Sequence, residues 1–190
     1  MSEQHTFFRI SPALQGICEE VTASLREIFS QIEETTEYNQ QKVLAAFIET
    51  YHPSWFTRVG LRYVNAFRRE ALGLDGMLWK ELITPGFLGL MGEEDAQETA
   101  FLKHELSATF QVPGGAKANV KSGPGLLRKN RTRETTEEKV FMLDLDLFMD
   151  SKIELGQAVP ALNIVHENAG SLFRAALTDT LSDAMEPQKA

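Results

Sequence analysis

Apolar residues recur at three- and four-residue steps near both ends of the chain. The first stripe follows Ser11, a residue suited to capping a helix, and Pro12, which suits the first helical turn. Its members are Leu14, Ile17, Cys18, Val21, Leu25, Ile28, Phe29 and Ile32. The second stripe lies between Val159 and Met185, and its members are Leu162, Val165, Ala169, Leu172, Phe173 and Ala176. This spacing predicts a long amphipathic helix at each end, with a shorter helix around 43–48 that His52-Pro53 would end.

The middle of the chain changes to a period of two, which predicts strands. In Phe56 to Asn65, Val59, Leu61 and Tyr63 face one side, whereas Arg58, Gly60 and Arg62 face the other. Val140 to Met149 alternates in the same way and places Asp144 and Asp146 on one face. Residues 100–112 and 116–120 flank Pro113-Gly114-Gly115 and predict a β-hairpin. Ser122 to Lys139 has the composition of a surface connection.

These elements predict one α+β domain with an antiparallel sheet of about four or more strands. The two long helices are expected to pack together on one face of that sheet. The domain would span residues 11–186, after a flexible N-terminus at 1–10 and before a polar tail at 187–190. The apolar segment Leu72 to Leu90, which includes Trp79, is expected to form a short helix followed by a packed loop that covers an edge of the core.

Composition narrows the class of protein further. With 43% apolar and 24% charged residues over 190 positions, the chain is typical of a folded protein with one core. The net charge of −8 disfavours non-specific binding to nucleic acid or anionic lipid. The single cysteine, Cys18, allows no intrachain disulfide and is interpreted as a small core residue. The sequence has no signal peptide and no apolar run of about 20 residues, so a cytoplasmic location is expected.

Arg58, Arg62, Asp144 and Asp146 form the first candidate site. If their strands are neighbours, the guanidinium and carboxylate groups would meet as cross-strand ion pairs that need no ligand, which is the favoured interpretation. Alternatively, the arginines would clamp a phosphate or carboxylate, and Gly60 would let the ligand approach the backbone.

Two histidines, His104 and His166, could add proton transfer to such a site. Each is more readily interpreted as a hydrogen-bonded residue at the edge of the core. An Asp-x-Asp pair with one histidine could hold a divalent cation, but the sequence offers no second ligand pair at diagnostic spacing. No metal, cofactor or catalytic residue is therefore predicted.

A basic cluster forms the second candidate site. Its members are Arg128, Lys129, Arg131 and Arg133. Residues 121–139 hold six basic and three acidic groups, a net +3, which leaves −11 for the rest of the chain. Phosphates could bind here, but no aromatic residue is interleaved to stack on a base, and the neighbouring glutamates weaken the field. A solvated loop is the favoured interpretation.

A resemblance to a known family rests on two segments, Arg58-Val-Gly-Leu-Arg-Tyr-Val-Asn65 and the later Leu143-Asp-Leu-Asp146. Together with the terminal helix that holds His166, they resemble a sporadically distributed family of uncharacterised bacterial proteins marked by an R-[I/V]-G-L-R-Y-[I/V]-N strand. The resemblance implies no particular activity, and it implies an accessory role. Family members usually carry a strand-bearing segment before the first long helix, which this chain is expected to lack.

The sequence therefore favours a non-catalytic binding or interaction module over an enzyme. Its partner would be a second copy of the chain, through the long helices or the Trp79 to Leu90 segment, or another protein. A small-anion-binding protein or enzyme that uses the arginine and aspartate face is the first alternative. Nucleic-acid contact through the basic cluster is the second.

Overall fold

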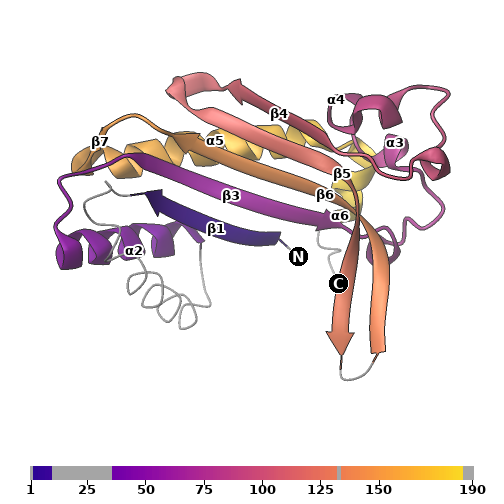
Figure 1. The fold of residues 1–190 in the computed structure, drawn as a ribbon, viewed down its shortest axis with the longest axis horizontal. Helices are drawn as coiled ribbons and strands as arrows, with labels where there is room; N and C mark the ends of the chain where they lie inside the picture. Colours follow the sequence, from indigo (N-terminus) through magenta and orange to yellow (C-terminus); the bar gives the residue numbers. More distant parts are fainter. Residues whose placement is uncertain (1, 10–35, 132–133, 186–190) are drawn as a thin grey trace.

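The centre of the protein is a five-stranded antiparallel sheet with the strand order β1-β3-β6-β5-β4 (Figure 1). The computed structural model describes residues 2–9, 36–131 and 134–185. The strands of the sheet are β1 (Ser2–Arg9), β3 (Arg58–Phe67), β4 (Leu106–Gln111), β5 (Lys117–Arg131) and β6 (Glu134–Met149). Two further short strands, β2 (Trp55–Phe56) and β7 (Ile153–Glu154), pair with each other beside it. The predicted α+β class and antiparallel sheet are confirmed.

Helices lie at the edges and on one face of this sheet (Figure 1). They are α2 (Thr36–Tyr51), α3 (Trp79–Leu82), α4 (Pro85–Leu88), α5 (Ala158–Ala176) and α6 (Asp179–Met185), with short 3₁₀ turns between them. Helix α5 packs across β3 and β6, as the C-terminal apolar stripe predicts. The predicted helix over Ser11 to Ile32, with Cys18, lies outside the described residues. Among the described helices, none combines the length and the hydropathy needed to cross a bilayer.

The predicted C-terminal helix is in fact two helices. Leu177, between α5 and α6, is extended (φ −94°, ψ 143°) and forms a β-bridge with Ile83. The next residue, Thr178, donates its backbone N–H and its hydroxyl to the Leu82 carbonyl, at 3.0 Å each. Its hydroxyl oxygen also accepts the Leu181 N–H at 3.4 Å, which satisfies a donor at the start of α6. The helix ends at Ala176 because the backbone that follows pairs with α3.

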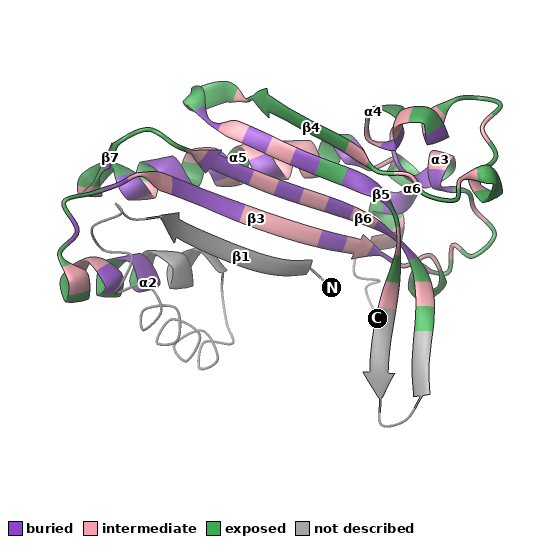
Figure 2. Cartoon of the chain, in the orientation of Figure 1, coloured by how far each residue is buried: buried purple, intermediate pink, exposed green. Residues whose placement is uncertain are grey.

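The core lies between the sheet and α5. Along β3 and β6 most residues facing α5 are buried, while most of those on the opposite face are partly exposed (Figure 2). Val59, Leu61, Leu143 and Leu147 are all fully inaccessible to solvent. This is the pattern of an antiparallel sheet with one face covered and one face solvated, and it confirms the alternation predicted for both strands.

Three predicted boundaries are wrong. Ser2–Arg9, expected to be flexible, is the edge strand β1, with Ser2 opposite Asn65 and Arg9 opposite Arg58. A strand therefore does precede the predicted first helix, contrary to the expectation that this chain lacks one there. The hairpin strand predicted from residue 100 begins only at Leu106, after a 3₁₀ turn at Glu98–Ala100.

The third wrong boundary is the predicted surface connection, Ser122 to Lys139. Its residues continue β5 and β6 as a long hairpin, with pairs from Ser122 opposite Leu143 to Arg131 opposite Glu134. Gly123, Gly125 and Pro124 sit inside β5. Two strands hydrogen-bonded to each other tolerate these turn-type residues where sequence composition alone indicates a loop.

The apolar segment from Trp79 to Leu90 packs at one end of the sheet, where it forms α3, α4 and the start of a 3₁₀ turn (Figure 1). Trp79, Leu82, Ile83 and Leu88 are buried. The hydroxyl of Ser122 on β5 donates to the Phe87 carbonyl at 2.6 Å and ties the segment to the sheet. The predicted packing of this segment on the core is confirmed, but most of it is helical where a loop was predicted after a short helix. Its apolar side chains are mostly used in the chain's own core.

Candidate functional site

Strand β3 carries the first candidate cluster on its solvated face. Arg62 donates from Nε and Nη2 to the two carboxylate oxygens of Asp144, at 2.8 and 2.6 Å. Arg58 donates from Nη2 to both oxygens of Asp146, at 2.9 and 3.0 Å. Arg62 stands opposite Asp146 in the register but pairs with the diagonal Asp144, and Arg58 reaches past the Gly60–Phe148 pair to Asp146. The predicted cross-strand pairing therefore exists.

Gly60 makes this arrangement possible. A Cβ atom at Gly60 would lie 2.8 Å from the Leu147 carbonyl oxygen and 2.9 Å from the Phe148 Cβ. The Phe148 ring opposite it supports the Arg58 guanidinium, whose central carbon is 3.5 Å from the ring centroid. Gly60 is thus required by the close approach of β6, which accounts for it without a ligand.

The polar contacts continue across the sheet from Asp146. Asn119 on β5 donates to Asp146 Oδ2 at 3.2 Å, and Thr109 on β4 donates to Asn119 Oδ1 at 2.9 Å. The hydrogen bond from Arg62 to Asp144 raises the pKa of the Arg62 guanidinium, which keeps it charged at any physiological pH. The four charged residues of the first cluster are all matched within the chain, so a ligand would have to compete with existing pairs.

A double-mutant cycle on Arg62 and Asp144 measures how much the interaction between the two side chains contributes to the stability of the fold. We expect a coupling free energy of about 1 kcal/mol between Arg62→Ala and Asp144→Ala, because Arg62 is 43% exposed and its bidentate pair is only partly desolvated. Chemical denaturation of the wild type, both single variants and the double variant gives this value. A cycle on Lys152 and Glu154, whose side chains are 61% and 63% exposed, is the matched control and is expected to give less. Equal coupling in the two cycles would contradict a structural role for the Arg62 pair.

The two histidines do not join this cluster. His104 lies in the loop before β4, not on a strand as predicted, and its Nε2–H donates to the Leu88 carbonyl at 2.7 Å. Its ring meets Phe101 edge-on at 5.4 Å. His166 lies on α5, across the sheet from Arg62, with its Nδ1 2.7 Å from the Tyr63 hydroxyl. Both are hydrogen-bonded histidines at the edge of the core, as the favoured interpretation expects.

Arg128, Lys129 and Arg131 of the basic cluster lie on β5, in the projecting end of the β5–β6 hairpin, whereas Arg133 lies outside the described residues. We call residues Leu126 to Lys139 the arm, which extends away from the sheet (Figure 1). Within the described strands, these residues pair only with one another. The register sets Arg128 opposite Glu137 and Arg131 opposite Glu134, so two of the three described basic positions are opposite an acidic position. Acidic positions this close weaken the positive field that the arm offers to phosphates.

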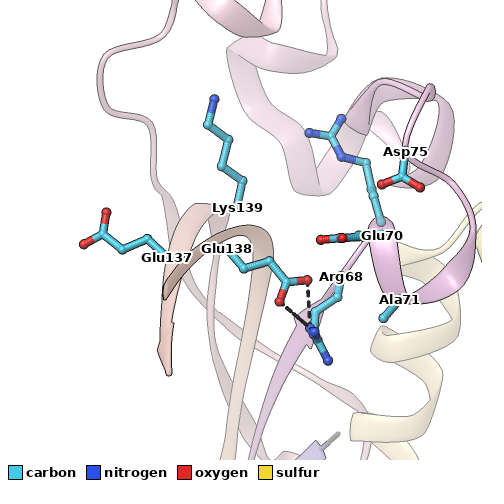
Figure 3. A pocket seen from close by; sticks show the side chains of 8 residues that line it. Arg68, Glu70, Ala71, Asp75, Glu137, Glu138 and Lys139 are labelled. Carbon is cyan, nitrogen blue, oxygen red and sulfur yellow. Dashed lines mark hydrogen bonds and ion pairs between the residues drawn. The ribbon is translucent and has the colours of Figure 1, made fainter. Parts of the chain in front are cut away.

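A cleft of about 660 Å³ lies where the arm leaves the sheet (Figure 3). Glu138 is turned toward Arg68, whose Nη2 lies 2.7 Å from a Glu138 oxygen, and this contact raises the pKa of Arg68. Glu137 and Lys139 extend away from that pair (Figure 3). Acidic and basic groups alternate around the cleft, with no concentration of one sign that would select a charged ligand. Its clearest role is to fix the arm to the body through Arg68 and Glu138.

Sequence reasoning missed two residues on the buried face of the same strand. Tyr63 and Asn65 point toward α5 and, with His166, line a cavity of about 290 Å³ between the sheet and the helix. Asn65 takes a position in the alternation of β3 where its neighbours Leu61 and Phe67 are apolar and buried. A carboxamide on the buried face of a strand is the signal that could have found this site.

Metal ligation finds no support in the parts of the chain that the structure describes. Within residues 2–9, 36–131 and 134–185, no three His, Cys, Asp or Glu side chains come together as a metal site.

Comparison of the chain with protein-family models, with curated proteins and with solved structures found no match. The function is therefore argued from the chain's own geometry.

Proposed function

We propose that this protein is a non-catalytic interaction module that associates with other copies of itself through the arm. The observation that carries the proposal is that residues 126–139 extend beyond the sheet and, within the described strands, pair only with each other. An isolated two-stranded hairpin is marginally stable in water, so a projecting hairpin gains order when a partner covers it. Leu126, at the base of the arm, is 56% exposed and offers apolar surface to such a partner.

Charge complementarity favours a second copy as that partner. Residues 121–139 carry a net +3, whereas the remainder of the chain carries −11. An arm from one copy would therefore be attracted to the body of the next, where Glu93, Glu94 and Asp95 form an exposed acidic turn. The Trp79 to Leu90 segment is less suited to this role, because most of its large apolar side chains are already in the core.

The first cluster supports a non-catalytic role. Arg58, Arg62, Asp144 and Asp146 hold one another in ion pairs, and both histidines have hydrogen-bond partners elsewhere. An anion-binding enzyme at this face would need at least one of these charges to be available. The alternative of a small-anion site is accordingly weaker than the interaction module.

The resemblance to the R-[I/V]-G-L-R-Y-[I/V]-N family, with an accessory role in the cytoplasm, remains part of this proposal. Its support is geometric: the two motifs that carry the resemblance lie on adjacent strands, with Asn65 opposite Leu143 and Arg62 opposite Asp146. The arginines of one motif pair with the aspartates of the other. This gives a physical reason for the two motifs to occur together in one chain.

Shortening the arm tests the proposal. A variant in which Asn-Gly joins Leu127 directly to Glu138 closes the hairpin with a two-residue turn, because these residues face each other in the register, and it keeps the Arg68–Glu138 pair. We expect the intact protein to self-associate, and the association constant to fall about tenfold or more in the shortened variant and at high salt. Sedimentation velocity over a concentration series measures both effects.

The control is the unfolding temperature of the shortened variant, which should stay close to that of the intact protein because, within the described strands, the removed residues pair only with one another. An intact protein that stays monomeric, or a shortened variant that associates equally well, would refute the proposal.

Nucleic-acid contact makes a different prediction: a labelled duplex would bind in low salt, and binding would vanish when Arg128, Lys129, Arg131 and Arg133 are all changed to Gln.

A further inference from the structure

The cavity between β3 and α5 has the character of a small-molecule site. We call it the α5 cavity; it is a partly open pocket of about 290 Å³ and adjoins a second open hollow of about 350 Å³ that shares Asn65 and Phe173. Its floor is made by two small residues of α5, Ala169 and Gly170, and no residue that lines it carries a carboxylate, ammonium or guanidinium group. A mostly apolar cavity with a few converging polar groups is the usual form of a ligand site.

Asn65 supplies the polar group that is not satisfied by the fold. Its side chain is buried, with the residue 8% exposed, and its Nδ2 donates to the Leu143 carbonyl over a long 3.4 Å. Because a carbonyl oxygen only accepts, this contact fixes the orientation of the amide and turns Oδ1 away from β6. Within the described part of the chain, no hydrogen bond reaches that oxygen. A buried acceptor without a partner is rare in folded proteins and marks a place where a donor is missing.

The other residues that line the α5 cavity indicate the shape and the charge of the ligand. Phe173, Tyr63 and His166 present aromatic rings to the cavity, and the last two hold each other through the 2.7 Å contact between the Tyr63 hydroxyl and His166 Nδ1. Flat apolar groups fit against such rings, whereas an ion placed among these residues would lose its hydration without a countercharge.

We propose that the α5 cavity binds a neutral, planar, mainly apolar small molecule that donates one N–H or O–H group to Oδ1 of Asn65. This inference is independent of self-association through the arm, because the cavity and the arm share no residue. It also gives the arginine motif a second role: its charged face joins the strands, and its Tyr63 and Asn65 serve the opposite face.

A pair of matched probes tests the polar contact. Indole has a planar apolar body with one N–H donor, and benzofuran has the same shape without the donor. We expect indole to bind the full chain with a dissociation constant below about 1 mM and at least about fivefold more tightly than benzofuran, as one hydrogen bond would give. Isothermal titration calorimetry measures both constants. In Asn65→Leu, the preference for indole should disappear.

A pair of substitutions at Gly170 tests the location. Leucine at this position adds side-chain volume to the cavity floor, while alanine adds one methyl group; within 4 Å the Cβ itself meets only the guanidinium end of the Arg174 side chain, at 3.3 Å. Both residues favour the helix over glycine, so both variants should remain folded. We expect Gly170→Leu to abolish binding of both probes and Gly170→Ala to retain it.

Failure of indole to bind the wild-type protein, or equal binding by Gly170→Leu and Gly170→Ala, would overturn the proposal. If Asn65→Leu does not fold, the Gly170 pair and the comparison of the two probes on the wild-type protein still decide it.

Discussion

Replacing Trp79 with alanine is expected to lower the free energy of unfolding by about 3–5 kcal/mol. Trp79 is 2% exposed and is the first residue of α3. Its ring lies 5.4 Å from that of Phe141 on β6, and the Arg69 guanidinium covers it at 4.2 Å. Alanine would leave a cavity at the contact between α3 and the sheet, and it would remove the support of the arginine above it.

Trp79→Ala should lower the free energy of unfolding by more than the cavity left by the missing ring accounts for. Glu98 accepts the Trp79 N–H at 3.0 Å and also pairs with Arg69, so the tryptophan lies within a set of contacts that close the segment between β3 and β4. Urea denaturation monitored by circular dichroism measures the effect. Trp55→Ala is the matched control: Trp55 is 38% exposed and has Lys152 over its ring, so its loss should cost less than about 1 kcal/mol. Equal costs at the two tryptophans would contradict the anchoring role given to Trp79.

The second large effect is expected at Gly60, where a single added methyl group should destabilise the fold by about 2–3 kcal/mol. The Cβ of Gly60→Ala would meet the Leu147 carbonyl oxygen at 2.8 Å and the Phe148 Cβ at 2.9 Å. Both atoms belong to or lie next to the backbone of β6, which is fixed between β3 and β5 in the centre of the sheet. Relief therefore requires β3 and β6 to separate locally, which also disturbs the Arg58–Asp146 pair.

Gly76→Ala provides the comparison. A Cβ at Gly76 has no atom within 4 Å and its backbone is free of positive φ, so alanine there should be neutral or slightly stabilising. Thermal and urea unfolding of the two alanine variants gives the difference directly. If Gly60→Ala were as stable as Gly76→Ala, Gly60 would not be required by the packing of β6, and the earlier interpretation that it admits a ligand to the backbone would regain support.

The sequence by itself determined the strands whose two faces differ in polarity. Alternation along Arg58–Phe67 and Val140–Met149 predicted which residues are buried, because a strand turns successive side chains to opposite sides. It also allowed Arg58 and Arg62 to be matched with Asp144 and Asp146 as cross-strand pairs. That prediction required only that the two strands be neighbours, since opposite charges on one face attract each other.

Tertiary structure decided what alternation could not encode. The predicted loop at 122–139 became paired strands because each strand supplies hydrogen-bond partners to the other, and glycine and proline in β5 do not prevent this. β1 formed on β3 for the same reason. Such pairing joins residues far apart in sequence, so no local pattern marks it.

The tertiary structure also decided which of the candidate site residues lie together. The alternative of a shared site would place His166 near Arg62, but α5 packs on the opposite face of the sheet and brings His166 to Tyr63 instead. Asn65 became a candidate ligand contact only in the folded structure, where it lines the α5 cavity together with Ala169 and Gly170 of α5. Residue identity determined which face of a strand each group occupies. What lies across from that face depends on helix packing, which is set by the volumes of side chains from the whole domain and not by the sequence near the site.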